Sequence, residues 1–169
     1  MLRPRTRTGT LSFASRLARP ADEVWAHATS MRGVNQELAP WLRMTYPAGF
    51  DDLAATVLRS GGAPPEEPLF TSWILALGLV PAERWRLRIV ALGPERRFVE
   101  ESRVLTLSLW RHERSVSADG ERACTLRDTL TFSPRVAVAL PLVTALVRAL
   151  FTRRHAFLRR RFGEAPPAA

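Results

Sequence analysis

The chain has 169 residues, of which 46% are hydrophobic and 24% charged, a composition that excludes a disordered or fibrous protein. This length suffices for one domain with a hydrophobic core and is short for two. The formal net charge is +9, and every basic residue is an arginine. Two explanations stay open, a GC-rich coding sequence or a surface that meets an anionic partner such as a membrane.

Cys124 is the only cysteine, which excludes an intrachain disulfide and a CxxC metal site. Residues 1–9 form a basic N-terminal arm that no apolar segment follows, so a secretory signal is not expected. The most apolar stretch, 136–147, is too short to span a bilayer before an arginine interrupts it. We therefore expect a cytoplasmic protein.

The first part of the chain predicts a strand followed by two short helices. Large apolar residues alternate with small or polar ones over 11–17, which is typical of a strand. A proline followed by two acids within 20–26 predicts the start of a helix. Ser30 opens a second helix that ends at Leu38, and 42–46 predicts a short strand.

The segment 49–68 is rich in glycine and proline. Asp51 and Asp52 favour a turn or two of helix through Leu58, and 61–65 predicts a loop. A loop of this kind inside a regular domain is a candidate lid over the mouth of a cavity.

The middle of the chain predicts an antiparallel meander. Alternation is strictest over 84–89, where Trp85, Leu87 and Ile89 share one face and three arginines share the other. Asp119-Gly120, between two alternating segments, is a strong hairpin signal. The predicted strands are 70–79, 84–89, 98–102, 107–117 and 122–132.

One long helix is predicted from 135 to 162, with a bend near Pro141. Its apolar face comprises Leu140, Val143, Val147, Leu150, Phe151, Leu158 and Phe162. Residues 164–169 are expected to form a short, loose tail.

This order of elements resembles the START-like, SRPBCC helix-grip superfamily, which includes polyketide cyclase/dehydrase-like proteins and a bacterial ligand-binding branch. The segments that carry the resemblance are 19–25 (RPADEVW), 70–75 (FTSWIL) with Gly78 and Pro81, 110–114 (WRHER), 128–135 (DTLTFSPR) and 151–155 (FTRRH).

The resemblance implies a single α+β domain over 10–163. Its helix-grip fold has a curved antiparallel sheet of about six or seven strands wrapped around the long C-terminal helix, with two short helices after the first strand. It also implies a hydrophobic cavity between sheet and helix. It does not imply one reaction, because carriers, sensors and enzymes share this fold.

Several charged residues share a face with core residues. Strict alternation places Asp128 on the buried face of its strand, and Arg154 follows the apolar face of the helix with His155 at its edge. A buried charge is costly unless it is paired. We predict a network between sheet and helix, formed by Glu100, Arg114, Asp128 and Arg154.

Two interpretations of this network stay open. It locks the helix in register against the sheet, or part of it lines the cavity and holds the polar end of a ligand. A shift of one residue in strand register would reverse these assignments.

Aromatic residues are numerous in the predicted strands, as they are in apolar pockets, although core packing also accounts for them. The predicted cavity residues are Trp41, Tyr46, Phe70, Trp73, Trp85, Leu87, Phe98, Glu100, Trp110, His112, Arg114, Asp128, Leu130, Val147, Phe151 and Arg154.

We expect a binding or carrier protein for a small lipid-, isoprenoid- or polyketide-like ligand, without catalysis or a cofactor. The alternative is an aromatase/cyclase- or dehydratase-type enzyme in which His112, Arg114 and Asp128 polarise carbonyls or move protons. The three histidines lack the spacing of metal ligands, and no motif reads nucleic acid. The arginine-rich helix end, 153–161, is interpreted as a solvated face, and weak contact with an anionic membrane is the alternative.

Overall fold

The computed structural model describes residues 7–59 and 67–166, so the predicted loop at 61–65 lies outside the described residues. The strands are β1 (Gly9–Leu17), β2 (Leu42–Met44), β3 (Phe70–Ala76), β4 (Val80–Leu87), β5 (Ile89–Gly93), β6 (Arg97–Glu101), β7 (Arg103–Val104), β8 (Leu107–Ala118) and β9 (Cys124–Pro134). The helices are α1 (Ala21–Thr29), α2 (Met31–Leu38), α3 (Leu53–Arg59) and α4 (Leu140–Phe162), and a short 3-10 turn, η1 (Ala137–Ala139), precedes α4.

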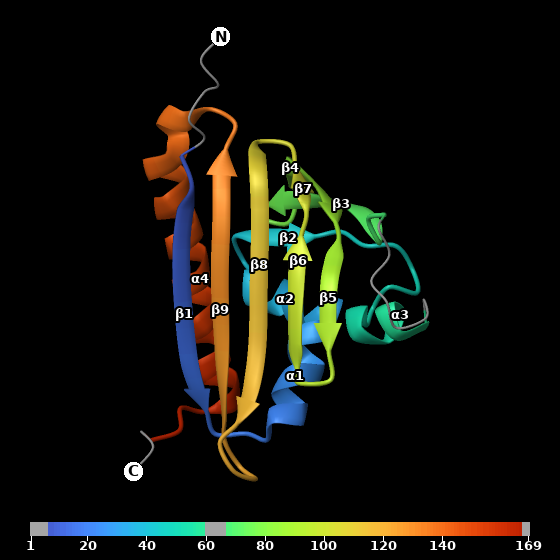
Figure 1. Cartoon of the computed structure of the whole chain (residues 1–169), viewed down its shortest axis with the longest axis vertical. Helices are drawn as coiled ribbons and strands as arrows, with labels where there is room; N and C mark the ends of the chain where they lie inside the picture. The colour runs from blue at the N-terminus through green and yellow to red at the C-terminus, as the bar shows by residue number, and fades with distance from the viewer. Residues whose placement is uncertain (1–6, 60–66, 167–169) are drawn as a thin grey trace.

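The strands pair antiparallel in two sheets, a five-stranded sheet in the order β1-β9-β8-β6-β5 and a four-stranded sheet in the order β2-β3-β4-β7. Figure 1 shows the larger sheet in front, with α4 running along its rear behind β1 and β9. The α+β architecture, the two short helices after the first strand and the long C-terminal helix confirm the predicted helix-grip fold.

The predicted strand 84–89 is divided between β4 and β5, which belong to different sheets. Its alternating pattern continues through Ile89, which is buried like Leu87. The alternation of side chains therefore does not indicate the break at Arg88. The division of this segment into β4 and β5, together with the two-residue strand β7, accounts for the strands beyond the six or seven expected.

The junction of α1 and α2 is tight, and it directs α2 toward the sheet. The Ser30 hydroxyl oxygen accepts a hydrogen bond from the Gly33 N–H at 2.9 Å, which caps α2 as predicted. A Cβ atom added to Gly33 would lie 2.1 Å from the carbonyl oxygen of His27, so only glycine permits this approach.

The long helix begins at Leu140 rather than at 135, and Pro141 lies in its first turn. In that turn the missing proline N–H leaves no helical hydrogen bond unmade, so the bend predicted near Pro141 is not needed. After the helix, the Ala165 N–H donates to the carbonyl oxygen of Arg16 at 3.2 Å. The first residues of the expected loose tail thus lie against the end of β1.

Two hydrophobic clusters lie between the larger sheet and α4, one around Leu126 and Leu158 and the other around Leu130 and Phe151. Asp128 lies on β9 between Leu126 and Leu130 and is fully buried with them. A polar layer therefore separates the two halves of the core. Within residues 7–59 and 67–166, no helix is long and apolar enough to cross a membrane.

Candidate ligand-binding site

A cavity of about 470 Å³ lies between α4, α2 and the strands of both sheets. Its volume is in the range of small-molecule pockets. Most of its wall is hydrophobic, with contributions from Met31 and Leu38 of α2, Ile74 of β3 and Leu150 of α4. The side chains of sheet and helix thus leave space between them.

Ten of the predicted cavity residues lie on this wall, namely Trp41, Trp85, Leu87, Phe98, Glu100, Trp110, His112, Val147, Phe151 and Arg154. Arg114, Asp128 and Leu130 are fully buried behind it. Phe70 packs edge-on against Phe50 at a centroid distance of 5.2 Å.

Tyr46 and Trp73 also lie outside the wall. Tyr46 packs at the edge of the hydrophobic cluster that contains Ile74. Trp73 is half exposed, because the alternation of β3 turns its neighbours Ser72 and Ile74 inward.

The residues of α2 that line the cavity were not predicted from the sequence. Met31, Val34 and Leu38 recur at the spacing of one helical face, and all three line the cavity. That spacing was the available signal for this part of the site.

Trp41 and Leu146 line the mouth of the cavity, since both contribute to the wall and remain 44% and 61% exposed. The guanidinium carbon of Arg153 lies 5.2 Å from the centre of the Trp41 ring, and this residue also donates to the carbonyl oxygen of Ala39. Leu53 of α3 reaches the wall, so part of the segment proposed as a lid contributes to the cavity.

Glu100 is the buried carboxylate of the wall. Its Oε1 accepts hydrogen bonds from Trp85 Nε1, at 2.7 Å, and from the Ser102 hydroxyl, while Oε2 lies 3.6 Å from His112 Nδ1. Burial raises the pKa of this carboxyl, but the His112 ring and the donated hydrogen bonds outweigh burial and hold the pKa below its ordinary value. Glu100 is therefore ionised at neutral pH.

His112 connects the wall to the buried layer behind it. Its Nε2 lies 2.7 Å from Asp128 Oδ1, so one ring nitrogen faces each carboxylate. The ring can donate to both carboxylates only when both nitrogens carry protons.

Asp128 receives donors from two elements. Arg114 Nε donates to Oδ1 at 2.7 Å and Arg114 Nη2 to Oδ2 at 2.9 Å, and His155 Nε2 lies 3.0 Å from Oδ2. Burial raises the pKa of Asp128, but the Arg114 charge and the histidine contacts hold it well below its ordinary value.

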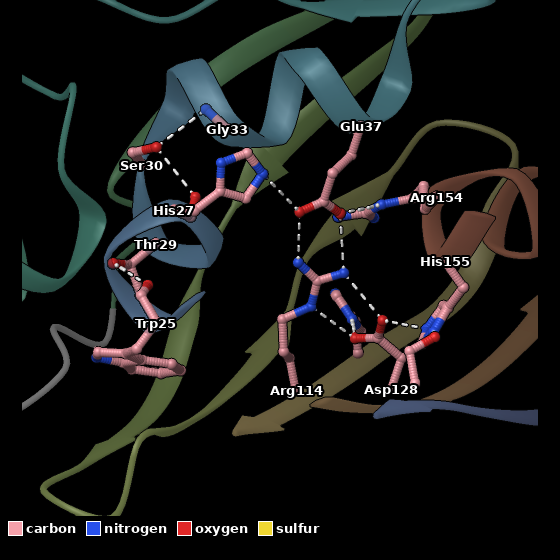
Figure 2. A network of polar contacts seen from close by, with 12 residues as sticks. Trp25, His27, Thr29, Ser30, Gly33, Glu37, Arg114, Asp128, Arg154 and His155 are labelled. Atoms are coloured by element: carbon pink, nitrogen blue, oxygen red, sulfur yellow. Dashed lines mark hydrogen bonds and ion pairs between the residues drawn. The ribbon is translucent and has the colours of Figure 1, made fainter. Parts of the chain in front are cut away.

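Glu37 of α2 completes the network and was not predicted. Figure 2 shows Arg114 between Glu37 and Asp128, with Arg154 and His155 reaching in from α4. Arg114 Nη1 and Nη2 donate to the two Glu37 oxygens at 2.9 and 3.0 Å, and Arg154 Nε donates to Oε2 at 2.8 Å. Although burial raises the pKa of Glu37, the two guanidinium groups hold it below its ordinary value. The sequence signal for the burial of Glu37 is its position three residues after Val34, on the inward face of α2.

All four predicted members, Glu100, Arg114, Asp128 and Arg154, belong to this network. It joins β6, β8 and β9 to α2 and α4, as a structural lock would. Glu100, His112 and Arg154 also line the cavity, as a ligand-binding role would require. Across the described part of the chain, no three side chains of His, Cys, Asp or Glu are placed to hold a metal ion.

Solved structures of several proteins have the same fold. The aromatase/cyclase ZhuI from Streptomyces sp. R1128 is 13% identical, with a TM-score of 0.62 over 90% of this chain and 92% of that chain. A START superfamily protein from Mycobacterium smegmatis is 10% identical, with a TM-score of 0.63 over 90% and 96% of the two chains. Norcoclaurine synthase from Thalictrum flavum, in complex with dopamine and hydroxybenzaldehyde, is 14% identical, with a TM-score of 0.57 over 95% of each chain.

These low identities establish a shared fold and no more. No curated protein sequence matches the chain. The family described as a domain of unknown function, DUF8410, matches residues 15–162. The chain therefore belongs to the DUF8410 family, and its fold is the START/SRPBCC helix-grip fold predicted from the sequence.

Proposed function

We propose that this protein binds a small hydrophobic molecule, of lipid, isoprenoid or polyketide type, in the cavity between sheet and C-terminal helix, without chemical conversion. The observation that carries the proposal is the cavity itself, about 470 Å³ in volume, with an apolar wall and a few charged side chains. Apolar surface of this kind gains free energy when a hydrophobic ligand displaces water from it.

The state of the charged groups supports binding rather than catalysis. Arg154 is paired with Glu37, and His112 lies between two carboxylates, so each is held by partners within the protein. A general base needs a lone pair open to the substrate proton, and the Nε2 atom of His112 faces Asp128 at 2.7 Å rather than the cavity.

Native mass spectrometry of the purified protein tests the proposal. We expect a bound population heavier than the protein by the mass of one small hydrophobic molecule, which organic extraction should release for identification. Protein that carries nothing, and that binds no apolar compound when one is added, would refute the proposed function.

An enzyme of the cyclase or dehydratase type is the second candidate, and the position of His112 favours it. This residue lies on the cavity wall with Asp128 behind it at 2.7 Å, an arrangement in which the carboxylate orients the imidazole ring beside a bound substrate. The named activities of ZhuI and norcoclaurine synthase are consistent with such chemistry on this fold. Unchanged turnover of a true substrate by a His112→Ala variant would exclude this mechanism.

A further inference from the structure

The charges around the cavity are nearly all compensated within the protein. Glu37 and Asp128 are the negative partners of Arg114, and Glu37 is also the partner of Arg154. Each guanidinium group therefore already faces a carboxylate. Neither guanidinium group of this network is left to compensate the charge of an incoming anion.

The remaining carboxylate, Glu100, lies on the cavity wall, and its Oε2 atom is 3.6 Å from Nδ1 of His112. Glu37, Asp128 and Glu100 supply three carboxylates to the network, and Arg114 and Arg154 supply two guanidinium groups, so an anionic ligand would add a further negative charge. Glu83, the other carboxylate of the wall, accepts hydrogen bonds from the backbone N–H groups of Leu105 and Thr106. Both acids on the wall therefore repel a ligand anion.

The two oxygens of Glu100 differ in their hydrogen bonding. Oε1 accepts from Trp85 and Ser102, whereas the contact of Oε2 with His112, at 3.6 Å, is longer than a hydrogen bond. Oε2 has no hydrogen-bond donor among the residues that the structure describes. A carboxylate oxygen on an apolar wall gains from a donor, and a ligand can supply one.

We propose that the ligand carries a neutral hydroxyl group, phenolic or alcoholic, at its buried end and donates a hydrogen bond to Glu100, and that the cavity discriminates against carboxylate ligands such as fatty acids. This inference rests on the proposed binding function and narrows its ligand class. The arginine content favours an anionic partner, but Arg154, the arginine of the cavity wall, is already paired with Glu37.

Three probes of one shape test the inference: 2-naphthol, which donates a hydrogen bond, 2-methoxynaphthalene, which cannot, and 2-naphthoic acid, which is an anion at pH 7.5. Their dissociation constants are measured by isothermal titration calorimetry on the full chain. We expect 2-naphthol to bind about tenfold more tightly than 2-methoxynaphthalene and at least about 30-fold more tightly than 2-naphthoate.

The Glu100→Gln variant should lose most of this discrimination, with the ratio of naphthoate to naphthol dissociation constants falling at least about fivefold. Glu101→Gln is the matched control on the same strand. Its side chain pairs with Arg111 and is not part of the cavity wall, so its ratio should equal that of the wild type. Circular dichroism melts should confirm that both variants are folded.

The possible failures are distinguishable. Naphthoate binding as tight as naphthol binding, or a ratio unchanged in Glu100→Gln, overturns this inference and leaves the proposed binding function in place. Absence of binding by all three probes overturns the proposed function, and this inference with it.

Discussion

Arg114 and Glu37 form a fully buried ion pair with two hydrogen bonds, although they lie 77 residues apart in the chain. The pair joins β8 to α2, and the second edge of the same guanidinium group holds Asp128 of β9. Removing one partner of such a pair leaves an uncompensated buried charge, which costs far more than the intact pair contributes.

Substitution of Arg114 by methionine should therefore destabilise the protein by at least about 3 kcal/mol, because Glu37 and Asp128 would be left facing each other without a cation. Urea denaturation followed by circular dichroism measures the free energy of unfolding. The control is Arg111→Met on the same strand, whose ion pair with Glu101 is partly exposed and should contribute about 1 kcal/mol or less. Equal losses in the two variants would contradict the assigned role.

Acid should unfold the protein through this network. The folded-state pKa values of Glu37, Glu100 and Asp128 are all held below those of an unfolded chain. The stability that they contribute is complete above the unfolded pKa, near about 4, and is lost as the pH falls toward the folded values. The free energy of unfolding should thus decrease steadily below about pH 5.

The Asp128→Asn variant should be less stable at pH 7 and should show a shallower decrease in its free energy of unfolding with acid. Asparagine cannot be protonated in this pH range, so the contribution of the Asp128 carboxyl to the pH dependence of the free energy of unfolding disappears. An identical slope in variant and wild type between about pH 5 and 3 would show that Asp128 does not have a depressed pKa.

Gly33 should tolerate no side chain. In the Gly33→Ala variant the new methyl group would meet the His27 carbonyl oxygen at 2.1 Å and the Ser30 hydroxyl oxygen at 2.8 Å, so α1 and α2 must separate. We expect a loss of about 2 kcal/mol or more in the free energy of unfolding. Gly93→Ala is the control, because the nearest atom to its added Cβ is at 3.9 Å, and its stability should change little.

The sequence predicted the elements and much of the buried polar layer, because both depend on local periodicity. Alternation along β9 identified Asp128 as buried, and the helical period of α4 did the same for Arg154. In each of these elements the same face stays buried over many residues, so the burial of a residue can be predicted from its position within that element alone.

Pairing between elements could not be predicted in the same way. Glu37 belongs to a short helix whose orientation depends on the tight junction at Gly33, and no pattern within that helix indicates which cation it meets. The division of 84–89 between two sheets also lacked a local signal, because alternation continues across the break. Tyr46 and Trp73 were selected for aromatic character, whereas strand geometry decides which side chains face the cavity.

Binding of the neutral fluorescent probe N-phenyl-1-naphthylamine is the most direct measurement, compared between the wild type and two variants of α4. Val147 lies on the cavity wall, and Val147→Phe should fill part of the space, whereas Leu142 is 63% exposed and is not on the wall. We expect saturable binding of one probe per chain, weakened at least about tenfold in Val147→Phe and unchanged in Leu142→Phe. Binding that is absent in the wild type, or equally strong in Val147→Phe, would show that the space between sheet and helix is not a ligand site.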